Sequence, residues 1–78
     1  MKALREPIYV ARKDTTDGQL KVTVKRTQSG HYIIGEHHPT HGSIELLDAA
    51  TVLGRTDEEA KHQADRVMAG YIRFHQAA

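Results

Sequence analysis

The last third of the chain constrains the fold most, because it has the pattern of a helix with one apolar face. Thr56 and Glu59 have the spacing of a capping box, in which each side chain satisfies a free backbone N–H group at the start of a helix. Apolar or helix-compatible residues then recur at helical intervals on one side. A helix of this kind must bury its apolar side against another element. The residues of this apolar side are Ala60, Ala64, Val67, Met68, Tyr71, Ile72 and His75.

Chain length and composition restrict the architecture further. The 78 residues are enough for one domain, residues 1–78, and a chain of this size buries only about 60% of its unfolded surface. The absence of cysteine excludes a disulfide framework and thiolate metal ligands. Residues 1–7 do not contain the apolar segment of a signal peptide, and no apolar run reaches membrane-spanning length. We therefore expect a cytoplasmic protein. Because so small a chain buries little surface alone, homodimerisation is one way for it to bury more apolar surface.

Three segments before the helix have the composition of β-strands. They are residues 7–13, with β-branched and aromatic side chains, residues 19–27, which alternate between apolar and polar, and residues 31–36, with two consecutive Ile. Short turns rich in Gly and Asp separate them, which favours antiparallel pairing. The alternation in the second segment predicts one face that packs under the helix and one that does not. The first face is Leu20, Val22 and Val24; the second is Lys21, Thr23 and Lys25.

Residues 43–53 allow two interpretations. They could form further strands at 43–47 and 50–53, or a short helix capped by Ser43 and running to Ala50. We favour strands, because Thr51 follows too closely for a second helix before the cap of the last one. Pro and Gly in residues 37–42 predict a loop there.

Together these segments predict an α+β fold. It is a small antiparallel β-meander of three to five strands, with one C-terminal amphipathic helix, about residues 57–75, packed on one face of the sheet. The other face is expected to remain available for water, a partner or a second subunit.

Charge is distributed unevenly although the formal net charge is only +1. Residues 1–31 carry seven Lys or Arg against three Asp or Glu, whereas residues 32–59 carry one against six. We interpret the basic residues of the first two strands as a candidate partner-binding surface, with ordinary solvated charge as the alternative. The candidate residues are Arg12, Lys13, Lys21, Thr23, Lys25 and Arg26.

Histidines are concentrated before and after Pro39. Imidazole is a common ligand of zinc, copper and nickel, so these histidines are candidate metal ligands. They lack the helical H-E-x-x-H spacing that fixes two ligands and a base on one face, and a His-rich surface loop is the favoured interpretation. No metal or other cofactor is therefore predicted. The candidates are His31, His37, His38 and His41.

The absence of a catalytic motif favours a binding protein over an enzyme. A sheet with one helix has little concavity for a substrate pocket, and no serine has the sequence context of a nucleophile elbow. We expect a non-enzymatic protein that binds another protein, as do small inhibitors from phages and mobile elements that cover a host machine, anti-CRISPR proteins among them. The alternatives are a nucleic-acid-binding regulator that uses the basic sheet face, with phosphate contacts from lysines, and a metal-binding module that uses the histidines.

Overall fold

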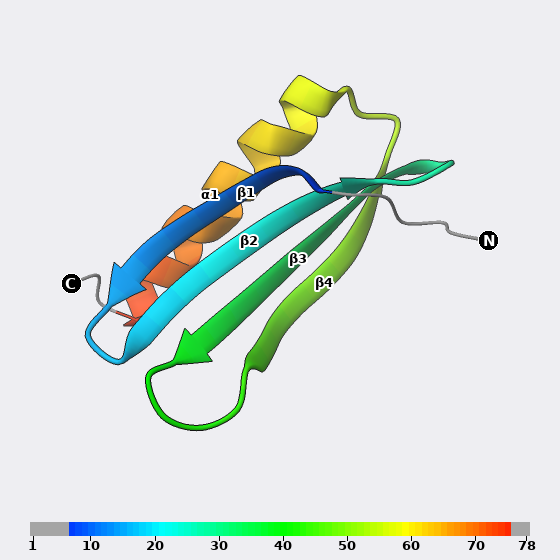
Figure 1. The fold of residues 1–78 in the computed structure, drawn as a ribbon. Coiled ribbons are helices and arrows are strands. Elements are labelled where there is room, and N and C mark those ends of the chain that lie inside the picture. Colours follow the sequence, from blue (N-terminus) through cyan, green and yellow to red (C-terminus); the bar gives the residue numbers. More distant parts are fainter. Residues whose placement is uncertain (1–6, 76–78) are drawn as a thin grey trace.

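A computed structural model, which describes residues 7–75, has the predicted α+β architecture. Four strands form one antiparallel sheet in the order β1-β2-β3-β4, and a single helix follows them (Figure 1). Each strand pairs with the one before it in the chain, so the sheet is a simple meander. The elements are β1 (Pro7–Thr15), β2 (Gly18–Arg26), β3 (Gly30–Pro39), β4 (Glu45–Leu53) and α1 (Asp57–His75).

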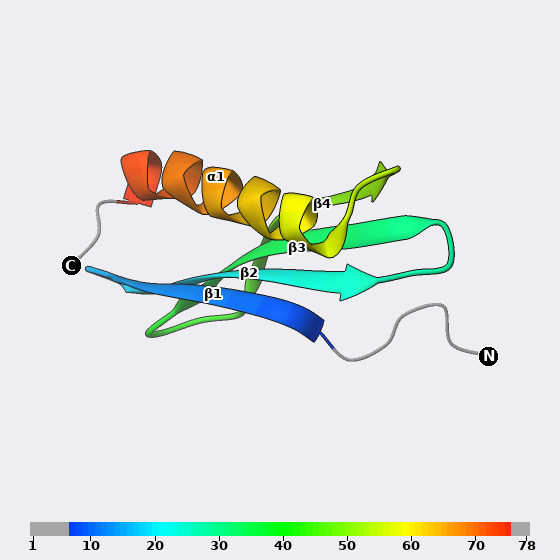
Figure 2. The same ribbon diagram turned by 90° about the horizontal axis from the view of Figure 1, so that it is seen from above.

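The helix covers one side of the sheet only. Figure 2 shows the strands as one layer with α1 lying along one side of it, and in Figure 1 the helix lies behind the sheet. The helix packs over β1, β2 and β3. The opposite side, which we call the open face, carries no element within residues 7–75. This arrangement places every other side chain of each strand either under the helix or on the open face.

The core lies between β2 and the helix, where the sequence pattern placed it. Leu20, Val22 and Val24 are fully buried, and Ile33 of β3 lies beside them. Burial of side chains of this size stabilises the fold by roughly 1.5–3 kcal/mol each. The helix contributes Ala60, Ala64 and Met68, with Val67, Tyr71 and Ile72 packed around them. His75 belongs to the helix, but its side chain lies outside the described residues.

The predicted capping box forms at the start of α1. The backbone N–H of Glu59 donates to Oγ1 of Thr56 at 3.1 Å, and the backbone N–H of Thr56 donates to Oε1 of Glu59 at 2.9 Å. The hydrogen bond from the Thr56 backbone, followed by the charge of Arg55, lowers the pKa of Glu59. The helix start is therefore fixed by two residues three positions apart.

Two predictions from the sequence are corrected by the structure. His37 and His38 are not in a loop, because β3 continues to Pro39 and His37 pairs with Leu20 on one side and Glu45 on the other. Residues 43–47 and 50–53 are not separate strands or a helix: most of them belong to one strand, β4, with a register shift opposite Gly35 and Glu36.

Candidate interaction surface

Strand register defines which side chains share the open face. Thr23 lies at its centre, with Val10 of β1 on one side and Ile34 of β3 on the other, and Ile34 in turn lies opposite Ala49 of β4. Thr23 is buried although no helix covers it. Its longer neighbours therefore shield the middle of the open face, where these four side chains are uncharged.

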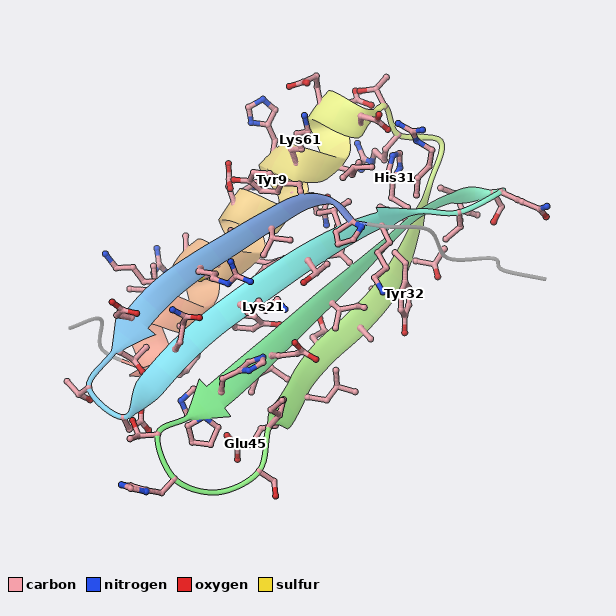
Figure 3. All side chains as sticks on the ribbon, viewed as in Figure 1. Tyr9, Lys21, His31, Tyr32, Glu45 and Lys61 are labelled. Carbon is pink, nitrogen blue, oxygen red and sulfur yellow. The ribbon has the colours of Figure 1, made fainter. Side chains whose placement is uncertain are left out.

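A basic strip lies along β1 and β2 on this face. Arg12 lies directly opposite Lys21, and Lys25 is on the same face four residues further along β2. Like charges in opposed positions are unfavourable unless an anion or a partner is nearby. Glu36, which faces Lys21 from β3, supplies one negative charge. We call Arg12, Lys21 and Lys25 the basic strip; Figure 3 views this face and labels Lys21 on it.

Two of the predicted partner-binding residues lie on the other side of the sheet. Lys13 lies opposite the buried Leu20, and Arg26 lies opposite His31. Both pairs belong to the helix side, because paired residues in an antiparallel sheet share a face. Of the six candidate partner-binding residues, Arg12, Lys21, Thr23 and Lys25 therefore share the open face. Lys13 and Arg26 do not belong to it.

Arg26 has a structural partner at the start of the helix. Its guanidinium forms an ion pair with Asp57, and Nε2 of the buried His31 lies 2.8 Å from the same carboxylate. These two contacts, with Arg26 the larger cause, lower the pKa of Asp57 to about 2. The cluster joins the β2–β3 hairpin to the first turn of α1, so its charges are engaged within the fold.

An apolar strip adjoins the basic strip on β3 and β4. Leu46 and Leu53 are 66% and 63% exposed, and the register places both on the open face, opposite Glu36 and Gly30. Tyr32 lies opposite Lys25 and is labelled on the open face in Figure 3. We call Tyr32, Ile34, Leu46 and Leu53 the apolar strip.

The two tyrosines of the strands have different surroundings. Tyr9 packs against the core on the helix side, and its hydroxyl donates to Oδ1 of Asp65 at 2.6 Å. That hydrogen bond raises the pKa of Tyr9. Tyr32 is thus the one strand tyrosine that faces away from the helix. Sequence reasoning did not find the apolar strip, because a register shift between β3 and β4 determines which side chains of β4 reach the open face.

The four candidate metal ligands do not converge. His31 and His37 face the helix side, at opposite ends of the sheet, whereas His38 is on the open face with its Nε2 atom 3.0 Å from Glu36. His41 lies exposed in the β3–β4 loop. Within residues 7–75, no group of three or more His, Asp or Glu side chains is arranged to hold a metal ion.

His37 instead joins two acidic side chains. Its Nδ1 atom lies 2.9 Å from Oε1 of Glu45, and its Nε2 atom lies 3.2 Å from Oδ1 of Asp17. The hydrogen bond to Glu45 raises the pKa of His37, and the bond to Asp17 adds to this against the opposing effect of burial. His37 therefore links the β1–β2 turn to the beginning of β4.

No protein family, curated protein or solved structure matches this chain. Within residues 7–75, α1 is the one helix, and it is too polar to cross a membrane. The physical character of the open face is therefore the basis for assigning a function.

Proposed function

We propose that this protein is a non-enzymatic binding module that recognises another protein through its open face. The observation that carries the proposal is the presence of basic and apolar strips side by side on a sheet face that no element of the described chain covers. Leu46 and Leu53 are each more than three-fifths exposed on that face, and exposed apolar side chains rimmed by charge are typical of protein-binding sites.

The chemistry of the two strips defines the partner. Arg12 and Lys21 repel each other across β1 and β2, and a carboxylate placed between them would relieve this repulsion. Leu46 and Leu53 would be covered by apolar side chains of the partner. The partner is therefore a protein surface with acidic residues next to an apolar patch. A phage or mobile-element inhibitor that covers a host machine is the specific version of this proposal suggested by the size of the chain.

The proposal is tested with two matched triple variants. One replaces the basic strip (Arg12→Ala, Lys21→Ala and Lys25→Ala), and the other removes the same charge from the helix (Lys61→Ala, Arg66→Ala and Arg73→Ala). Immobilised protein is incubated with lysate of the native host after nuclease treatment. The proposal expects a protein that is retained by the wild type and the helix variant, and lost from the basic-strip variant. Equal capture by both variants would contradict it.

A second candidate function is nucleic-acid binding by the same face. It is favoured by one observation: Tyr32 lies opposite Lys25 on the open face, so that an aromatic ring for base stacking adjoins a cation for phosphate. Binding of this kind falls steeply with salt because counterions are released. Fluorescence anisotropy with a labelled single-stranded oligonucleotide tests it. Salt-sensitive binding that Tyr32→Ala and Lys25→Ala both weaken would favour it, and no binding at low salt would exclude it.

A further inference from the structure

The two edges of the sheet differ in their protection against further strand pairing. The β1 edge begins at Pro7, has a register shift between Pro7 and Tyr9, and carries a run of three charged residues, Arg12–Asp14. Proline, bulges and charges are the devices by which edge strands avoid pairing with other chains. The β4 edge has no proline and no lysine, and its residues Ala49–Leu53 are uncharged. One edge is thus blocked and the other is not.

The β4 strand is also the least covered strand of the sheet. The helix packs over β1, β2 and β3, and within residues 7–75 β4 pairs with β3 only. Its outer backbone N–H and C=O groups therefore have no strand partner. Of its nine residues, only Leu47, Ala49 and Val52 are even partly buried. An edge strand with an uncharged half in this state is a template for an added strand.

We propose that a second copy of this chain pairs with β4, antiparallel, about a two-fold axis at Thr51. A two-fold contact requires each residue to meet a compatible residue of the same strand. Centring on Thr51 places it opposite Thr51 of the second copy, Ala50 opposite Val52, and Ala49 opposite Leu53. All these pairs are uncharged, and each joins residues of the same face.

Charge selects this register over those centred nearer to the start of β4. Centring on Ala49 or Ala50 places the Asp48 carboxylate opposite Ala50 or Val52 of the second copy, where it loses hydration without a partner. Centring on Thr51 places Asp48 opposite Gly54, which has no side chain. Gly54 has a φ of 68° and turns the chain out of the strand, and Arg55 follows it. Asp48 of each copy therefore lies at the end of the interface where the other copy supplies a cation.

The resulting dimer has a defined shape. An antiparallel edge-to-edge two-fold axis is perpendicular to the sheet, so the product is one eight-stranded sheet with both helices on the same side. The two open faces become continuous, with the apolar strips in the middle and the basic strips outside. Dimerisation is independent of the proposed function, because it is measured as molar mass with no partner present.

Opposite charges at position 51 give the direct test. Thr51 is exposed on the open face, so substitution there leaves the core intact. Light scattering on a dilution series is expected to give twice the 8.7 kDa chain mass for the wild type at high concentration. Thr51→Lys and Thr51→Asp alone should each remain at one chain mass, because two like charges then meet. An equimolar mixture should regain the dimer.

Two controls keep the result interpretable. Lys21→Ala, on the open face away from β4, should leave the dimer unchanged, and circular dichroism confirms that each variant is folded. Thr51→Cys gives a second measurement, since the chain has no other cysteine: mild oxidation should yield a disulfide-linked dimer, whereas Arg12→Cys on the β1 edge should not. A single-chain mass for the wild type at all concentrations would overturn the proposal. So would a dimer that Thr51→Lys and Thr51→Asp both leave intact.

Discussion

His31 of β3 and Asp57 of α1 are 26 positions apart in the chain, yet Nε2 of His31 lies 2.8 Å from Oδ1 of Asp57. Arg26 of β2 binds the same carboxylate. One acidic side chain in the first turn of the helix therefore holds the helix start over the β2–β3 hairpin. An acidic residue at this position also interacts favourably with the helix dipole.

We predict that Asp57→Asn lowers the melting temperature and removes part of the acid sensitivity of the fold. The pKa of Asp57 is about 2 in the folded protein, below its ordinary value of 3.8. Its contribution to stability is thus complete above pH 3.8 and is lost as the pH falls toward 2. Thermal unfolding followed by circular dichroism across that range should show the two proteins converging in stability at low pH. A constant difference would contradict the prediction.

The His37 cluster has the opposite pH dependence. Because the pKa of His37 is raised above 6.5, its contribution to stability is complete below pH 6.5 and is lost as the pH rises through the raised pKa. We predict that His37→Gln destabilises the protein more at about pH 5.5 than at about pH 8.5 in urea unfolding. An NMR titration of the His37 ring should give a midpoint above 6.5, and a midpoint below it would refute the assignment of the two carboxylate contacts.

Gly35 is predicted to resist substitution by any residue that carries a side chain. A Cβ atom there would overlap the hydroxyl end of the Tyr71 ring, which packs against β3 at this point. We expect Gly35→Ala to reduce the free energy of unfolding by about 1–3 kcal/mol, the usual cost of overpacking. Gly70→Ala is the matched control, because a Cβ atom there meets no atom within 4 Å. It should stabilise the helix by about 0.5–1 kcal/mol.

The contact between Gly35 and Tyr71 also predicts that a second substitution restores part of the stability lost in Gly35→Ala. The Tyr71 hydroxyl is buried and has no hydrogen-bond partner among the described residues, and burial raises the pKa of Tyr71. Removing an unpaired buried hydroxyl costs little or is favourable. Tyr71→Phe alone should therefore be nearly neutral, and in the Gly35→Ala background it should recover part of the lost stability. Urea unfolding of the four proteins measures this coupling, and strictly additive effects would argue against the overlap.

Local patterns in the sequence were sufficient for the helix and the core. Thr56 and Glu59 specify the helix start, and the alternation around Val22 specifies which face of β2 is buried. The end of β3 was missed because Pro39 indicates a loop. His37 is held in the strand by Asp17 and Glu45, contacts that arise only when the turn and β4 come together.

The candidate surface could be predicted only in part, because part of it also depends on how the strands pair. Lys25 and Arg26 are adjacent in β2, so their side chains lie on opposite faces of the sheet. The alternation of side chains along a strand is sufficient to predict this. Predicting the apolar strip also requires the pairing of β3 with β4. Leu46 and Leu53 both reach the open face because the register shifts in β4 opposite Gly35 and Glu36 of β3. That shift places Leu46 and Ala49, three positions apart, on one face, and strict alternation does not anticipate it.

Whether the open face binds a protein is decided by a capture experiment with the matched triple variants. Nuclease-treated host lysate is passed over the wild type, the basic-strip variant and the helix variant. We predict that a protein is retained by the wild type and by the variant lacking Lys61, Arg66 and Arg73, and is lost from the variant lacking Arg12, Lys21 and Lys25. Retention of the same protein by the basic-strip variant, with loss from the helix variant, would contradict binding through the open face and place recognition on the helix.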